Sequence, residues 1–128
     1  MNTRDRVIAV VDDDSSLLES LEDLLKSAGY GVRAFSSPLA FLASNEDWAI
    51  DCLITDIGLP GMDGFELREL AKRERPDLPV ILITGRIEIA EQRRSRDPAI
   101  RNDIFRKPFN SQALLDAVAR ALEAGKPE

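Results

Sequence analysis

Five short apolar runs, separated by longer amphipathic stretches, constrain the fold of this chain more than any other feature. Runs of this length that are rich in Val, Ile, Leu and Phe are typical of buried strands. The predicted strands are Arg6–Val11, Gly31–Phe35, Cys52–Asp56, Pro79–Thr84 and Asp103–Phe105. Strands that alternate with helices form a parallel sheet with helices on both faces. We therefore predict an α/β, doubly wound fold.

Each amphipathic stretch fits a helix. The leucines from Leu17 to Leu25 form one apolar stripe, which Asp14 or Ser15 can cap at its start. Gly29 is a natural stop for that helix. The other predicted helices are one capped by Ser36 or Ser37 that carries Leu39, Phe41 and Leu42, then Phe65–Arg75, Ile87–Arg96, and a last helix capped by Asn110.

The composition limits the classes of function. A chain of 128 residues suits one domain over residues 1–128, with a core expected at about 6–124. The sequence has no histidine and one cysteine, Cys52. A Ser-His-Asp or Cys-His relay and a histidine-containing zinc site are therefore excluded.

Charge and hydropathy indicate where the protein acts. The net charge of −6 argues against direct nucleic-acid binding, because phosphate backbones are bound by clusters of Lys and Arg. No apolar run is long enough to span a bilayer, and the first residues do not resemble a signal peptide. A single cysteine fits a reducing compartment. We expect a cytoplasmic protein that binds neither nucleic acid nor membrane.

Polar side chains stand where four predicted strands end, namely Asp12 and Asp13, Asp56, Thr84, and Lys107. The carboxyl ends of parallel strands lie at one edge of a sheet, so we expect these groups to meet. Three neighbouring carboxylates repel one another, and a hard cation relieves that repulsion. We predict Mg²⁺, with Mn²⁺ as the alternative ion. Asp56 is then predicted to be a carboxylate nucleophile that becomes phosphorylated, with Thr84 and Lys107 contacting the phosphoryl oxygens.

Four motifs follow one another along the chain: Val10–Asp14, Thr55–Pro60 with Gly64 after it, Ile83–Gly85, and Lys107–Phe109. Each motif is weak alone, but the set is specific in this order and spacing. Together they resemble the receiver domain of two-component response regulators, closest to the nitrogen-fixation type. The resemblance covers about residues 7–122. It implies a flavodoxin-like fold, with a five-stranded parallel sheet in the order 2-1-3-4-5 and five flanking helices.

The resemblance also implies a role for each site residue. The implied Mg²⁺ site is Asp12, Asp13, Asp56 and the backbone carbonyl of Gly58. Asp56 would be the phosphoacceptor, Thr84 the switch hydroxyl and Lys107 the lysine that pairs with the phosphate. The Lys107–Pro108 bond would be cis, a minority state that tight turns select.

The implied partner is a histidine kinase or a phosphotransfer protein, which supplies the phosphoryl group. Phosphorylation would switch the face of the fourth helix, fifth strand and fifth helix, which is also the expected homodimer contact. Such a chain is no enzyme beyond catalysing its own phosphorylation and dephosphorylation. Ile104 departs from the family, which usually carries an aromatic residue there, and Arg93–Pro98 replaces the usual Ala-Gly segment.

Several alternatives stay open. The Asp12–Asp14 run alone would merely cap a helix. The chain could be a phosphate sink, or a degenerate receiver that acts by protein contact. A phosphohydrolase with an aspartyl nucleophile usually needs a second Asp where this chain has Gly58. A flavin- or nucleotide-binding domain needs phosphate donors after the first strand, where the aspartates would repel the ligand. The sequence is equally compatible with a stand-alone receiver and with the regulatory half of a longer regulator.

Overall fold

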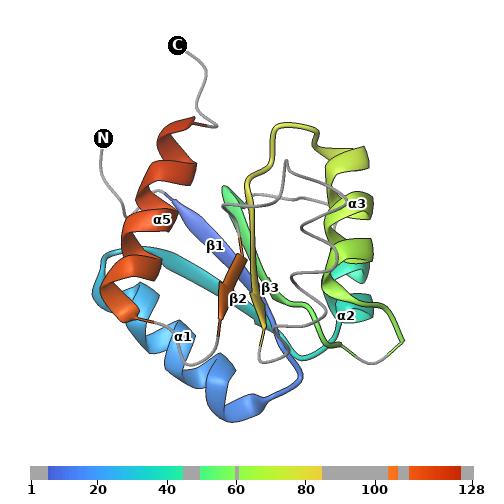
Figure 1. Cartoon of the computed structure of the whole chain (residues 1–128), viewed down its shortest axis with the longest axis horizontal. Coiled ribbons are helices and arrows are strands. Elements are labelled where there is room, and N and C mark those ends of the chain that lie inside the picture. The colour runs from blue at the N-terminus through green and yellow to red at the C-terminus, as the bar shows by residue number, and fades with distance from the viewer. Residues whose placement is uncertain (1–5, 45–49, 60, 85–103, 107–109, 125–128) are drawn as a thin grey trace.

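A computed structural model describes residues 6–44, 50–59, 61–84, 104–106 and 110–124, with only the backbone at 104–106 and at 124. Five parallel strands form one sheet in the order β2-β1-β3-β4-β5 (Figure 1). The strands are β1 (Val7–Val11), β2 (Gly31–Phe35), β3 (Cys52–Asp56), β4 (Val80–Thr84) and β5 (Ile104–Arg106). The predicted parallel sheet and its strand order are confirmed, and the fifth strand lies one residue later than predicted.

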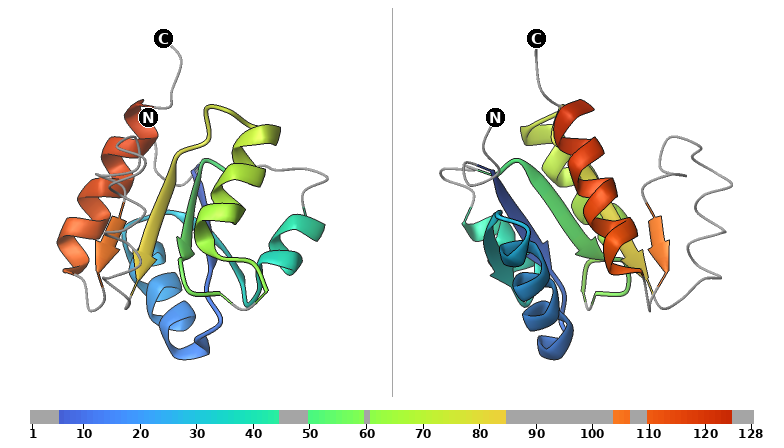
Figure 2. Two further views of the ribbon diagram at one scale, coloured as in Figure 1. Left: turned by 45° about the vertical axis from the view of Figure 1, so that its right-hand side comes forward. Right: turned by 90° about the vertical axis from the view of Figure 1, so that its left-hand side faces the viewer.

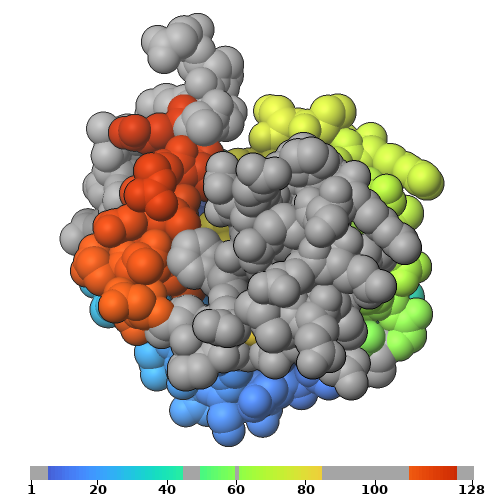
Figure 3. All heavy atoms as spheres, viewed as in Figure 1, coloured from blue at the N-terminus to red at the C-terminus, as the bar shows by residue number. Residues whose placement is uncertain are grey.

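Helices cover both faces of the sheet (Figure 2). The described helices are α1 (Ser15–Ser27), α2 (Pro38–Ala43), α3 (Gly64–Glu74) and α5 (Ser111–Ala124). The helix predicted over Ile87–Arg96 and the segment Arg93–Pro98 lie outside the described residues. In the space-filling view, the side chains of α5 and α1 form adjoining parts of the surface (Figure 3). Among the described helices, none combines the length and the apolarity that a membrane crossing requires.

Strand alternation divides the core into two layers. Ala9, Val11 and Leu53 pack with residues of α2 and α3, whereas Ile8 and Val10 pack with α1 and α5. Successive side chains of a strand point to opposite faces, so a strand buried on both sides is apolar throughout. That is the reason β1, β3 and β4 are almost entirely apolar, whereas the edge strand β2 includes the exposed Arg33. The same alternation decides toward which layer each strand-end residue points.

The helix starts follow the caps that the sequence indicates. Asp14 caps α1 by accepting hydrogen bonds from the backbone N–H groups of Ser16 and Leu17, at 3.0 and 3.3 Å. Ser37 caps α2, and the Asn110 side chain accepts from the Ala113 N–H at 2.9 Å at the start of α5. Gly29 follows α1 with φ of 97°, the left-handed conformation that ends many helices.

Leu39 differs from the other apolar residues of its helix. The sequence places it on the helix with Phe41 and Leu42, and in the structure its side chain is 71% exposed. The helix α2 has six residues, and it turns Pro38 and Phe41 into the core. Residues three and four apart share a helix face, so Leu39, one position after Pro38, faces outward.

Candidate functional site

Asp12 and Asp13 follow the last residue of β1, and their side chains have different surroundings. Asp12 is fully buried, and its backbone N–H donates to the Phe35 carbonyl at 3.1 Å, which continues the pairing with β2. Its carboxylate accepts a hydrogen bond from the Asp14 N–H at 2.9 Å. Asp13 is exposed. One aspartate is thus fixed by the turn, and the other faces solvent at the rim of the site.

Asp56 is the last residue of β3, and its side chain is 7% exposed. It stands opposite Ile83 in the sheet register, and the next residue, Ile57, donates its N–H to the Ile83 carbonyl at 2.9 Å. The neighbouring Thr55 hydroxyl donates to the Asp56 carbonyl at 3.1 Å. The backbone of Asp56 is therefore held by the sheet on one side and by a side chain of its own strand on the other.

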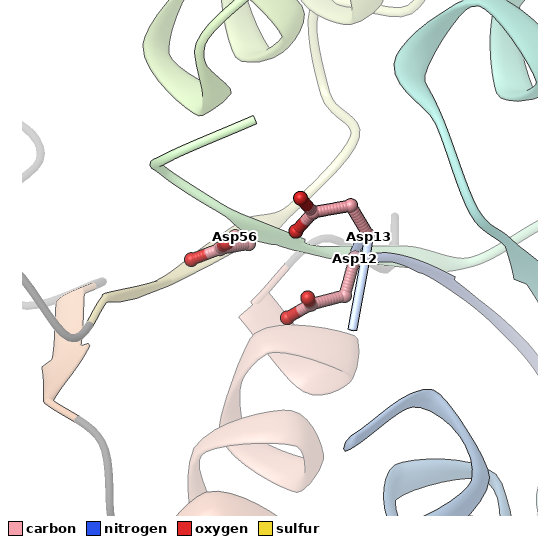
Figure 4. Close-up of side chains that lie close together, drawn as sticks. All are labelled: Asp12, Asp13 and Asp56. Atoms are coloured by element: carbon pink, nitrogen blue, oxygen red, sulfur yellow. The ribbon is translucent and has the colours of Figure 1, made fainter. Parts of the chain in front are cut away.

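The three carboxylates converge. Asp12, Asp13 and Asp56 each offer an oxygen that lies within 4.8 Å of the other two, and Figure 4 shows the three side chains gathered at the ends of β1 and β3. Neighbouring ligands around an octahedral Mg²⁺ lie about 3 Å apart and opposite ligands about 4.2 Å apart, given metal–oxygen distances of about 2.1 Å. All donors are carboxylate oxygens, which a hard cation prefers. The donor set therefore fits Mg²⁺ after small side-chain rotations.

Gly58 lies two residues after Asp56, in the loop that follows β3. Gly58 is exposed, and the loop is tightened by two hydrogen bonds to the Ile57 carbonyl, from the N–H groups of Leu59 at 3.1 Å and of Gly64 at 2.9 Å. Gly61 has φ of 82°, which favours glycine at the turn. The use of the Gly58 carbonyl as a metal ligand stays a prediction.

Of the two residues predicted to contact the phosphoryl oxygens, the structure describes Thr84 but not Lys107. Thr84 ends β4 and is 1% exposed, and it stands one residue beyond the position that pairs with Asp56. Its register partner on β5 is Arg106, the residue before Lys107. Lys107 and Pro108 lie outside the described residues, as does the side chain of Ile104. Their predicted roles, including the cis bond, therefore stay predictions.

Sequence reasoning missed two residues behind Asp56. Thr55 was read only as part of a motif, yet its hydroxyl contacts the carbonyl of the candidate phosphoacceptor. Gly64 was also only a motif residue, yet a Cβ at that position would lie 2.9 Å from the Ile57 Cα. A glycine placed directly after a helix cap, at the first position of α3, was the available signal, because a close backbone approach is one reason for glycine there.

Comparison with known proteins gives a consistent result. A family model described as the response regulator receiver domain matches residues 8–119. The response regulator protein TmoT of Ectopseudomonas mendocina is 37% identical over 124 residues, which cover 96% of this chain and 56% of that protein. The transcriptional regulatory protein FixJ of Bradyrhizobium diazoefficiens is 31% identical, over 94% of this chain and 58% of FixJ. The chain thus spans little more than half the length of these relatives.

Solved structures agree with the fold. Full-length FixJ from B. japonicum superposes with a TM-score of 0.82 at 31% identity, over 95% of this chain and 60% of that chain. The CheY-like receiver domain protein from Methanospirillum hungatei superposes with a TM-score of 0.81 at 29% identity, over 94% of this chain and 95% of that chain. The likeness to the second structure extends over nearly the whole of both chains.

Proposed function

This chain belongs to the response regulator receiver domain family, and from that premise we propose that Asp56 accepts a phosphoryl group in a Mg²⁺-dependent reaction. The proposed donor is the phosphohistidine of a histidine kinase or of a phosphotransfer protein. The observation that carries the proposal is the convergence of Asp12, Asp13 and Asp56, whose carboxylate oxygens lie within 4.8 Å of one another. Phosphorylation then switches a face that binds a partner or an output domain.

The chemistry follows from the position of Asp56. A carboxylate oxygen of Asp56 forms the new P–O bond while the P–N bond of the donor breaks, and the imidazole nitrogen keeps the bonding electron pair. Asp12, Asp13 and Asp56 would hold Mg²⁺, which supplies positive charge that offsets the charge of the phosphoryl oxygens. We propose that the Thr84 hydroxyl and the Lys107 ammonium contact the remaining phosphoryl oxygens, and that the Gly58 carbonyl adds a metal ligand.

Gly58 separates this function from turnover of external substrates. Hydrolysis of a phosphoenzyme by an aspartyl phosphohydrolase usually relies on a second carboxylate two residues after the nucleophile, as acid or base. Gly58 has no side chain and therefore cannot move a proton there. We propose that the chain catalyses only its own phosphorylation and dephosphorylation.

The scope of the proposal is one domain. We propose that residues 1–128 form a single receiver domain with a core at about 6–124, which the family match over residues 8–119 supports. We place it in the cytoplasm with its kinase. The switched face, formed by the fourth helix, fifth strand and fifth helix, is also the proposed homodimer contact, and α5 and the backbone of β5 are its described parts.

Mass spectrometry tests the phosphoacceptor. With acetyl phosphate and Mg²⁺, the wild-type chain should gain the mass of one phosphoryl group, and EDTA should prevent the gain. Asp56→Asn should show no gain, whereas Asp116→Asn, which changes an exposed aspartate on α5, should behave as the wild type. The proposal is wrong if the wild type gains no mass or if Asp56→Asn gains as much.

A second assay separates the receiver from the hydrolase. The protein is incubated with a phosphomonoester and Mg²⁺, and released phosphate is followed over time. We expect no release beyond the rate of the Asp56→Asn variant. Steady multiple turnover that depends on Asp56 would instead establish the phosphohydrolase.

A further inference from the structure

The first residue of α3 lies directly against the main chain that carries Asp56. A Cβ on Gly64 would overlap the Asp56 carbonyl oxygen, and it would lie 2.9 Å from the Ile57 Cα and 3.1 Å from the Asp56 carbonyl carbon. These neighbours are backbone atoms, so no side-chain rotation can relieve the overlap. Any other residue at position 64 therefore displaces either α3 or the Asp56–Ile57 peptide.

Hydrogen bonds hold this peptide and the next one from the α3 side. The Gly64 N–H donates to the Ile57 carbonyl at 2.9 Å, and the Thr55 hydroxyl donates to the Asp56 carbonyl at 3.1 Å. We call this arrangement the α3 seat. It consists of the contact of Gly64 with the Asp56–Ile57 backbone and the Gly64–Ile57 hydrogen bond. It lies on the face of the sheet opposite to the one toward which strand alternation turns the Asp56 side chain.

The packing of α3 decides which part would move. Phe65, Leu67 and Ala71 are buried in the core layer on that face, so the helix cannot withdraw without opening the core. The body of β3 is held between β1 and β4. Asp56 and Ile57 lie where this pairing runs out, because the register with β1 stops at Thr55 and only β4 still contacts them, through the Asp56–Ile83 pair and the Ile57 N–H. The displacement therefore falls on Asp56 and Ile57.

We propose that Gly64 is a positioning residue for the phosphoacceptor, because the α3 seat sets the position of the Asp56 carboxylate relative to Asp12 and Asp13. This inference deepens the proposed function and rests on it. The other two aspartates follow β1 and do not depend on the seat. A shift at Asp56 alone would therefore change the distances within the cluster, and misplacement by about 1 Å can slow a reaction about a hundredfold.

The chain offers a matched control in the same loop. A Cβ at Gly61 would meet no atom within 4 Å, but the φ of 82° strains any other residue there. Gly61→Ala therefore destabilises the loop without touching Asp56. Gly64→Ala adds the same methyl group against the Asp56 backbone. The two variants separate loss of stability from loss of positioning.

The test compares the phosphorylation rate with acetyl phosphate at saturating Mg²⁺, the Mg²⁺ affinity from amide chemical shifts, and the thermal midpoint. We expect Gly64→Ala to lower the rate about tenfold and to weaken Mg²⁺ binding, with the strongest amide shifts at Asp56 and Ile57. Gly61→Ala should lose thermal stability yet keep its rate and affinity within about twofold of the wild type. A fall of less than about fivefold for Gly64→Ala, or an equal fall for Gly61→Ala, overturns the inference.

The test still gives a result if Gly64→Ala does not fold or if the wild type is not phosphorylated. If Gly64→Ala does not fold, Asp63→Ala replaces it, because loss of the Asp63 cap loosens the start of α3 without adding atoms to the core. It should slow phosphorylation more than Gly61→Ala does, and an equal or smaller effect overturns the inference. If the wild type takes up no phosphoryl group, the proposed function fails, and the Mg²⁺ affinities of the same variants still decide whether the α3 seat positions Asp56.

Discussion

The neighbouring residues Asp13 and Asp14 have different tasks at the end of β1. Asp13 belongs to the carboxylate cluster, whereas Asp14 caps α1 through the N–H groups of Ser16 and Leu17. Asp13→Asn should weaken Mg²⁺ binding about tenfold or more, because it removes a charged ligand. Asp14→Ala should lower the free energy of unfolding by about 1 kcal/mol and leave Mg²⁺ affinity unchanged. Metal titration and urea unfolding of both variants measure the two effects, and equal loss of affinity in both would contradict the division.

Tyr30 makes the stability of the fold depend on pH in the alkaline range. Its side chain is 8% exposed, and burial raises the pKa of its phenol above 10.0, with a further rise from the nearby Cys52 and an opposing effect of Arg6. The folded state thus disfavours the phenolate, so this contribution to stability is complete below pH 10 and is lost as the pH rises through the higher folded pKa. Tyr30→Phe cannot ionise there. Urea midpoints should therefore fall more steeply above about pH 10 for the wild type than for Tyr30→Phe, and parallel curves would contradict the assignment.

At the residue scale, the chemical type of each site residue could be predicted from sequence, but the close contacts of Gly64 and Thr55 with the backbone could not. Asp12, Asp13 and Asp56 stand at strand ends, and strand ends are visible in the sequence, so their meeting was predictable. The contact of Gly64 with the Asp56 backbone depends on how closely α3 sits on the sheet, and a sequence states no such distance. Thr55 was missed for a different reason, since its hydroxyl bonds to the main chain of the next residue and nothing in the sequence marks that bond.

At the scale of elements, α2 shows where periodicity fails. The caps of α1, α2 and α5 were predicted from sequence, and the strand bounds came within one residue, because both depend on neighbouring residues. The inward face of α2 depends on the angle at which six residues meet the core, and the sequence therefore did not indicate that Leu39 faces outward. Short helices contain too few turns to define a stripe.

The same helix gives a matched pair of substitutions. Phe41 is 1% exposed and packs edge-to-face on Phe35, with ring centroids 5.5 Å apart, whereas Leu39 is 71% exposed. Phe41→Ala should lower the free energy of unfolding by about 3–5 kcal/mol because it leaves a cavity. Leu39→Ala should change it by less than about 0.5 kcal/mol. Urea unfolding of the two variants measures both values, and a large loss for Leu39→Ala would mean that α2 faces the other way.

At the scale of the whole molecule, the topology is the part that sequence predicted best. The strand order β2-β1-β3-β4-β5 places β1 and β3 side by side, so the residues after Val11 and at Asp56 must share one edge. That the strand ends share one edge follows from the parallel connections and needs no detail of packing, whereas the order that makes β1 and β3 neighbours was implied by the family resemblance. The fold therefore brings the three carboxylates of the site together, and the repulsion between their charges is a cost to the stability of the folded state.

That cost leads to a prediction for global stability. Without metal, three carboxylates held within 4.8 Å repel one another, so Asp56→Asn should be more stable than the wild type by on the order of 1 kcal/mol in EDTA. Mg²⁺ binds the folded site and should stabilise the wild type by about 2.7 kcal/mol at a hundred times its Kd. The variant lacks one ligand and should gain less. Urea unfolding of both proteins in EDTA and in Mg²⁺ measures this, and equal stabilisation of both by Mg²⁺ would show that the ion binds elsewhere. We therefore expect the order of stability to reverse, with Asp56→Asn the more stable protein in EDTA and the wild type the more stable protein in Mg²⁺. The reversal follows because the negative charges that repel one another without the ion attract the ion when it is present.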